Sequence, residues 1–265
     1  QIATLYGSGS AMANPMTLSP KPVAYYPLGD QDVFNSSSYL VPNSSLKDFV
    51  FDFGTYSDNK YISINNTFDS IITGTNFTVS GWAKVDSVNS NQYKYIFTNE
   101  TLQFAITNKL NTYLRGASGY FLSPFEGNTT LLANIWYHVV ITKSGNTYTY
   151  YLNGVNDGSV TNSTTPSNSS QSTSRIGKYY NLNTLSMIGE ISNVQIFNTA
   201  LPATGSNSVE TLYNNGSPLT SMTGFSSLVS WYKLNASDTY DSSTGNWTIE
   251  DHAGSNDGTS SGMTQ

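Results

Sequence analysis

The sequence contains no cysteine, and charged residues make up only 11% of its 265 residues. Without cysteine the chain can form neither disulfides nor thiolate metal sites, and it has no thiol nucleophile. An average domain has roughly 25% charged residues, so this surface must consist largely of Ser, Thr, Asn and Gly. Secreted proteins of complex organisms often carry disulfides. Their absence favours a microbial or viral surface protein, located outside the cell or on a virion.

The sequence also lacks an excess of positive charge and any long hydrophobic run. The net charge is −6 and the pI is near 4.7. Without a basic patch, neither nucleic acid nor an anionic membrane is an expected partner. No apolar run approaches the ~20 residues of a membrane helix, and residues 1–20 lack the charge and apolar core of a signal peptide. We therefore expect no membrane insertion.

Aromatic residues are abundant, at 13% of the chain, and they lie in patterns typical of β-strands. Residues 77–85 alternate apolar and polar side chains, and residues 135–142 and 147–152 flank a short hairpin loop. Further strands are predicted at 48–53, 60–64, 94–98, 102–107, 173–178 and 187–197. A single short helix is predicted at 209–214. Many short strands with frequent turns indicate a β-sandwich or a barrel.

Two segments of the sequence occur twice, in the same order. Residues 2–10 match residues 209–217, and residues 22–28 match residues 228–234, with a period of about 207 residues. A period of this length corresponds to a whole domain. The repeat therefore predicts one complete module between fragments of its neighbours. The predicted parts are the tail of a preceding module with a linker at 1–17, the complete module at 18–217, a linker at 218–227 and the start of a following module at 228–265.

The strand motifs of the predicted module resemble a known family. Phe77–Lys84 resembles its "FTISAWVK" strand, and Trp136–Gly154 resembles its "WYHVAVTYDG…LYVNG" hairpin. Gly189–Leu201 resembles "GxIDEVRIYNRAL", and Leu212–Gly216 resembles the closing "LYNSG". In this order the motifs are similar to the laminin-G-like jelly rolls of the concanavalin A-like lectin and glucanase superfamily. The resemblance implies an all-β chain folded as a two-sheet antiparallel jelly-roll sandwich. Tandem copies of this character are similar to structural proteins of marine bacteriophages.

Because the superfamily includes glucanases, glycoside hydrolysis is one candidate function. A retaining hydrolase needs two carboxylates roughly 5–5.5 Å apart, and the family's Glu-x-Asp-x-x-Glu pattern is missing from this sequence. His138 matches the family's own "WYH" strand, which favours a hydrogen-bonded framework residue, and His252 lies in a polar loop. No nucleophile elbow is present either. We therefore expect that the chain is not an enzyme.

A structural calcium ion is a second candidate feature. Calcium takes oxygen ligands from carboxylates and loop carbonyls, and Asp30, Asp32 and Asp52 follow predicted strands. The resemblance implies such a site, since many relatives carry one. The sequence departs from the family at an acidic pair, which is replaced here by Ser192–Asn193, and at an Asp, which is replaced here by Lys60. The alternative is that the three carboxylates are solvated in loops.

Glycan binding is the leading functional hypothesis, because sugars bind to aromatic faces beside amide and hydroxyl groups. The candidate aromatic residues are Tyr93, Tyr95, Tyr113, Tyr120, Phe121, Tyr179 and Tyr180. The alternative is that most of them fill the sandwich core. A host-attachment module would bind cell-surface glycans through repeated weak sites. A structural or decorating protein of a virion or filament would instead contact neighbouring copies or other virion proteins.

Overall fold

The computed structural model describes residues 33–34, 40–41, 51–65, 68–167, 173–181, 185–235 and 237–263. The chain divides into two compact units, Gln1–Asn43 and Ser44–Gln265. In the first unit, β1 (Val33–Phe34) pairs antiparallel with β2 (Leu40–Val41). All other described elements belong to the second unit, which carries the remaining strands and the helices.

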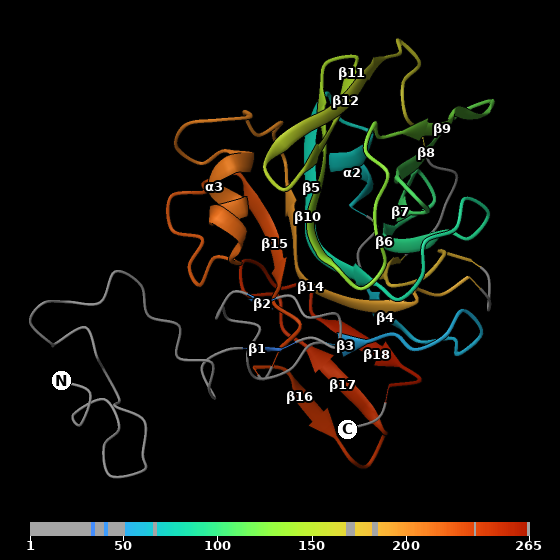
Figure 1. The fold of residues 1–265 in the computed structure, drawn as a ribbon, viewed down its shortest axis with the longest axis vertical. Helices are drawn as coiled ribbons and strands as arrows, with labels where there is room; N and C mark the ends of the chain where they lie inside the picture. The colour runs from blue at the N-terminus through green and yellow to red at the C-terminus, as the bar shows by residue number, and fades with distance from the viewer. Residues whose placement is uncertain are drawn as a thin grey trace, which may run out of the picture. The chain divides into compact units, whose positions relative to one another are not determined.

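The second unit consists of two antiparallel sheets (Figure 1). The first is seven-stranded, with the order β12-β11-β10-β5-β14-β15, and β3 pairs with β14. Its strands are β3 (Phe51–Asp52), β5 (Asn76–Val85), β10 (Trp136–Ser144), β11 (Thr147–Leu152), β12 (Val155–Thr161), β14 (Gly189–Phe197) and β15 (Leu228–Tyr232). The longest registers join β5 to β10 and to β14, at the centre of the sheet.

The second sheet is nine-stranded, with the order β16-β17-β18-β4-β13-β6-β7-β8-β9. Its strands are β4 (Tyr61–Ile64), β6 (Lys94–Thr98), β7 (Leu102–Ile106), β8 (Leu110–Gly116), β9 (Gly119–Glu126), β13 (Ser174–Ile176), β16 (Thr239–Asp241), β17 (Asn246–Ile249) and β18 (Gly258–Ser261). The predicted all-β, two-sheet antiparallel sandwich is therefore confirmed.

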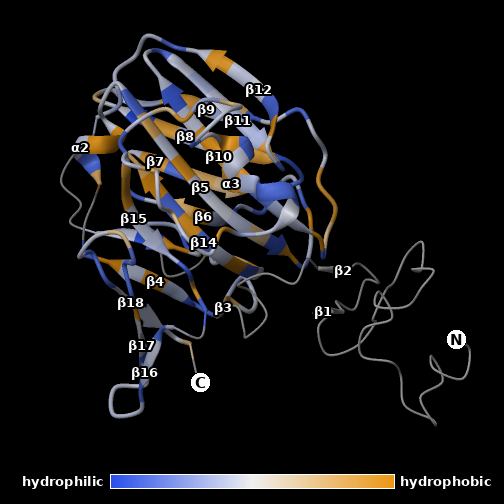
Figure 2. Cartoon of the chain, turned by 90° about the vertical axis from the view of Figure 1, so that its left-hand side faces the viewer, coloured by the Kyte–Doolittle hydropathy of each residue, from blue (hydrophilic) through white to orange (hydrophobic). Residues whose placement is uncertain are grey.

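The main hydrophobic core contains apolar side chains from both sheets, and hydrophobic positions recur along their strands (Figure 2). In β7, Leu102, Phe104 and Ile106 belong to this core, whereas the alternate residues Gln103 and Ala105 do not. This alternation follows from the two-residue period of a strand. Because of this alternation, the nine-stranded sheet has an inner face of core residues and an outer face whose residues, such as Gln103 and Ala105, lie outside the core.

The seven-stranded sheet is covered on its second face as well. Helix α3 (Val209–Tyr213), which is followed by the 3-10 turn η3 (Asn214–Gly216), lies on this face. The short helix α2 (Asp69–Ile72) lies before β5, and its Ile72 belongs to the main core instead. Ser208 caps α3, since its side chain accepts a hydrogen bond from the backbone N–H of Thr211. The helix predicted at 209–214 is confirmed. A second hydrophobic cluster joins this segment to the sheet and comprises Val140, Tyr151, Phe197, Leu201, Val209, Leu212, Met222, Phe225 and Trp231.

Residues 218–227 were predicted to be a linker, but the structure shows that they contribute to this cluster. Met222 and Phe225 are buried against the sheet and so form part of the domain. Burial of two large apolar side chains provides a stabilisation that an exposed linker lacks.

The structure also differs from the predicted start of a following module at 228–265. Strand β15 pairs with β14 and β18 pairs with β4, so this segment extends both sheets of the same unit. Tyr232 and Leu234 are fully buried in the main core. Without this segment, the edges of β14 and β4 would have unpaired backbone N–H and C=O groups, and β15 and β18 form hydrogen bonds with them. Residues 1–17, predicted as the tail of a preceding module with a linker, lie outside the described residues.

Candidate functional site

The outer face of the nine-stranded sheet carries a group of aromatic side chains. Cross-strand pairing places Tyr95 opposite Ala105, Gln103 opposite Tyr113 and Arg115 opposite Tyr120. Because Leu102, Phe104 and Leu114 point into the core, these alternate positions lie on the opposite face. Strands β6 to β9 thus bring residues that are distant in sequence onto one surface.

All six tyrosines predicted as sugar contacts lie in one continuous group, called here the tyrosine cluster. Its members are Tyr93, Tyr95, Tyr113, Tyr120, Tyr179 and Tyr180. The ring centroids are 6.2 Å apart for Tyr93 and Tyr95 and 5.5 Å apart for Tyr93 and Tyr113. The chain of contacts continues from Tyr113 to Tyr120 at 5.8 Å, from Tyr95 to Tyr179 at 5.4 Å, and from Tyr179 to Tyr180 at 4.7 Å.

Phe121 does not belong to this cluster. Its ring lies 6.4 Å from that of Tyr148, and it packs against the main core. Phe121 therefore faces away from the surface that carries the cluster. Successive residues of a strand point to opposite faces, so Tyr120 and its neighbour Phe121 cannot both face outward.

The members of the tyrosine cluster differ in exposure. Tyr120 is 43% exposed, whereas Tyr95 is 4% and Tyr180 is 8% exposed. Tyr93, Tyr113 and Tyr179 are half-buried. A ligand on this face would therefore touch Tyr120 and the half-buried rings, and Tyr95 and Tyr180 would support them from beneath.

Hydrogen bonds fix the orientation of the rings. The hydroxyls of Tyr93 and Tyr113 are 2.8 Å apart, and those of Tyr120 and Tyr179 are 3.2 Å apart. The side-chain amide of Gln103 donates to the hydroxyl of Tyr120. Burial raises the pKa of Tyr95, Tyr113 and Tyr179, so these hydroxyls stay protonated and can both donate and accept.

Polar and charged groups flank the cluster on the same strands. Arg115 forms an ion pair with Glu100, whose side chain is almost fully buried. The side-chain amide of Asn111 donates to the Glu126 carboxylate over 3.3 Å. Its oxygen Oδ1 is buried and has no hydrogen-bond partner among the described residues. The face thus combines aromatic surfaces with amide and carboxylate groups, a combination suited to hydroxyl-rich ligands.

His138 has the framework role predicted for it. Its Nε2 lies 2.8 Å from the Ser80 hydroxyl, and its ring centroid lies 5.2 Å from that of Trp82 and 6.1 Å from that of Tyr213. Burial lowers the pKa of His138 to about 3, so the ring is neutral near pH 7. His252 lies 3.1 Å from the Ser237 hydroxyl through Nε2.

The residues considered for calcium are only partly described. Asp30 and Asp32 lie outside the described residues, whereas Asp52 is paired in register with Glu190. The Asp52 carboxylate accepts a hydrogen bond from the backbone of Gly54 over 2.7 Å, and Glu190 forms an ion pair with Lys84 over 2.8 Å. No group of three or more acidic or histidine side chains among the described residues could hold a metal.

Comparison with known families identifies the class of protein. Residues 55–205 match the family described as the concanavalin A-like lectin/glucanases superfamily, which is more than half of the chain. The chain therefore belongs to this superfamily, as its strand motifs predict. No match was found among curated protein sequences. None of the described helices is long and apolar enough to span a membrane.

Several solved structures are similar to this chain at low sequence identity. A "putative carbohydrate binding protein" from Bacteroides ovatus is 21% identical, with a TM-score of 0.60 over 78% of this chain and 57% of its own. The chain thus spans a little over half of that protein. A SAP-like pentraxin from Limulus polyphemus is 20% identical, with a TM-score of 0.46 over 62% of this chain and 80% of its own. The CBM40 of a Ruminococcus gnavus sialidase, bound to α2,3-sialyllactose, is 13% identical, with a TM-score of 0.46 over 59% of this chain and 92% of its own.

Proposed function

We propose that this chain is a non-enzymatic glycan-binding module and that the outer face of β6 to β9 contacts the sugar. The observation that carries the proposal is the convergence of six tyrosines on that face. An exposed tyrosine ring can stack on the apolar face of a sugar, while its hydroxyl exchanges hydrogen bonds with sugar hydroxyls. The superfamily, whose description includes lectins, supports this function, as does the fold shared with the B. ovatus protein.

A glycan array probed with the full chain tests this proposal. We expect discrete hits that are lost in Tyr113→Ala and Tyr120→Ala. The matched control is Tyr240→Ala, because Tyr240 is a half-buried tyrosine on β16, at the other end of the same sheet. Binding that is absent from the wild-type array, or equally strong in all three variants, would contradict the proposal.

We also propose that the module acts outside the cell or on a virion surface, within a tandem array that serves attachment. The repeat of residues 22–28 at 228–234 supports the array, and linked weak sites gain strength through effective concentration. Sequencing of the complete reading frame would test this, with further copies at the same period as the expected result.

A structural or decorating role is the second candidate, and it is favoured by one observation. Strand β12 forms an edge of the seven-stranded sheet, and its Val155 is 70% exposed. Exposed sheet edges with apolar side chains pair readily with other chains. Concentration-dependent assembly that is abolished by Val155→Lys, together with an empty glycan array, would favour this role.

Calcium remains a proposal for the acidic pair Asp30 and Asp32. Two neighbouring carboxylates supply part of the oxygen ligand set that calcium requires. Calcium should raise the thermal midpoint of the full chain, and Asp30→Asn with Asp32→Asn should abolish the increase. An unchanged midpoint on chelation would contradict this proposal.

A further inference from the structure

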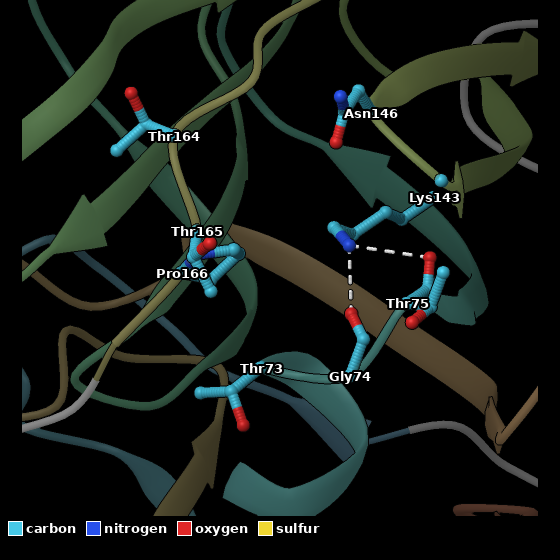
Figure 3. A pocket seen from close by; sticks show the side chains of 9 residues that line it. Thr73, Gly74, Thr75, Lys143, Asn146, Thr164, Thr165 and Pro166 are labelled. Atoms are coloured by element: carbon cyan, nitrogen blue, oxygen red, sulfur yellow. Dashed lines mark hydrogen bonds between the residues drawn. The ribbon is translucent and has the colours of Figure 1, made fainter.

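A small polar pocket lies away from the tyrosine cluster, at the end of the β10–β11 hairpin (Figure 3). Its volume is about 140 Å³. Three segments line it: the turn before β5, the hairpin end and the segment after β12. The lining residues are Thr73, Gly74, Thr75, Lys143, Gly145, Asn146, Thr164, Thr165 and Pro166. Asn146, Thr164 and Thr165 are exposed at its rim, so the pocket opens to solvent.

The charged group in this pocket is the ammonium of Lys143, whose side chain is buried at 5% exposure. Its Nζ donates to the backbone carbonyls of Gly74 over 2.7 Å and Thr75 over 3.2 Å, as Figure 3 shows. The ring of Tyr148 lies 5.8 Å away. Over the described part of the chain, no carboxylate lies within ion-pair distance of Lys143. Buried lysines are normally paired with a negative charge, and this one has only neutral acceptors.

We propose that this pocket binds the carboxylate of an acidic sugar, with Lys143 as its ion-pair partner. A single ammonium matches a single negative charge. The other wall groups are threonine hydroxyls, the Asn146 amide and backbone carbonyls, which suit the hydroxyls of a sugar ring. The pocket is smaller than the roughly 300–1,000 Å³ of sites for drug-sized ligands, so no more than one sugar unit would enter it.

The electrostatics of the pocket support this assignment. Burial lowers the pKa of Lys143, which means that its surroundings disfavour the charged form. A carboxylate beside Nζ would offset that penalty by direct attraction. The site extends the proposed glycan-binding function, on which its biological meaning rests, but it uses different residues from the tyrosine cluster.

The test measures binding of galacturonate and galactose to the full chain by calorimetry. We expect galacturonate to bind and galactose to bind at least about tenfold more weakly, because galactose lacks the charge-assisted hydrogen bond. Lys143→Met should reduce galacturonate affinity by about tenfold or more. Lys109→Met is the matched control, since Lys109 lies in the β7–β8 loop and outside the pocket, and it should bind as the wild type does.

A second variant keeps the proposal testable if Lys143→Met fails to fold. Asn146 is exposed at the rim, so Asn146→Asp should fold normally and should repel the ligand's carboxylate. Equal affinity of the wild type and Asn146→Asp for galacturonate would overturn the proposal. So would equal binding of sodium acetate and galacturonate, because the sugar ring would then contribute nothing.

The two functional proposals fail separately. If the Lys143 and Asn146 variants bind galacturonate as the wild type does while Tyr120→Ala loses its array hits, the pocket proposal fails and the tyrosine cluster stands. If the array is empty but galacturonate binding depends on Lys143, the tyrosine cluster proposal fails and the pocket stands.

Discussion

The hydroxyl of Tyr93 lies 2.8 Å from the hydroxyl of Tyr113, although the two residues are separated by 20 positions in sequence. Their rings also meet edge to face, with centroids 5.5 Å apart and an interplanar angle of 71°. Both contacts hold the rings in fixed orientations before any ligand arrives. A binding surface fixed in this way loses less side-chain entropy on binding than a mobile one.

Tyr120 is the most exposed member of the tyrosine cluster, so its substitution is the sharpest test of whether the cluster binds a glycan. We expect Tyr120→Ala to lower glycan affinity by at least about 0.5–1.5 kcal/mol, the usual worth of an aromatic contact beyond its buried area, because the loss of that area adds to it. The free energy of unfolding should change little. Calorimetric affinity and a thermal melt check the two expectations together. A fall in thermal midpoint that accounts for the lost binding would contradict a direct contact.

Tyr232 tests whether residues 228–263 belong to the sandwich. It is fully buried in the main core, so Tyr232→Ala should destabilise the whole unit by about 3–5 kcal/mol, as large-to-small core changes do. Chemical denaturation should still show one transition, shifted to lower denaturant. A main transition identical to that of the wild type would show that the segment folds separately.

Gly177 tests the packing between β13 and the start of the unit. Its φ is +84°, and a Cβ there would lie 2.0 Å from a ring carbon of Phe53. Gly177→Ala should therefore cost about 3 kcal/mol or more, through backbone strain and overpacking. The control is Gly205→Ala, at φ +95° with nothing within 4 Å of the added Cβ. This control should show only the cost of backbone strain, about 1–3 kcal/mol, and equal destabilisation of the two variants would contradict the role of Phe53.

His138 predicts a pH dependence of stability. Its pKa is about 3 in the folded chain, against about 6.5 when unfolded. Between these values the unfolded chain binds more protons, so this contribution to stability is present above about pH 6.5 and is lost as the pH falls toward 3. Relative to His138→Gln, the wild type should lose up to about 1.4 kcal/mol per pH unit in this window. Parallel urea titrations of both proteins measure the difference, and parallel pH profiles would contradict the prediction.

The regular strands could be predicted from sequence, because their alternation is strong. The predicted strand 77–85 corresponds to β5, and the hairpin of 135–142 and 147–152 corresponds to β10 and β11. In the second unit, strands β8, β9, β12, β16, β17 and β18 were not predicted. Gly116, Gly119 and Pro124 interrupt the first two as turn residues do, and β12 is mostly polar because it is an edge strand.

The candidate site was predictable in its residue types and unpredictable in its details. The six tyrosines predicted as sugar contacts, chosen as aromatic residues in or beside polar segments, are the members of the tyrosine cluster. Their exposures could not be predicted, since Tyr95 and Tyr120 differ tenfold through tertiary packing alone. The Lys143 pocket was missed, because the three segments that form it are far apart in sequence and carry no shared motif. The repeat of residues 22–28 at 228–234 likewise did not show which strand the second segment would pair with.

The second hydrophobic cluster has a consequence for any array of these modules. Helix α3 and the segment before β15 cover one face of the seven-stranded sheet, whereas none of the described helices covers the outer face of the nine-stranded sheet. Each module would therefore offer one sheet face for binding, the outer face of the nine-stranded sheet. In an array, several modules could bind the same surface only if the connections between them turned every binding face toward it. The rotation from each module to the next, rather than the number of modules, would then set the valency.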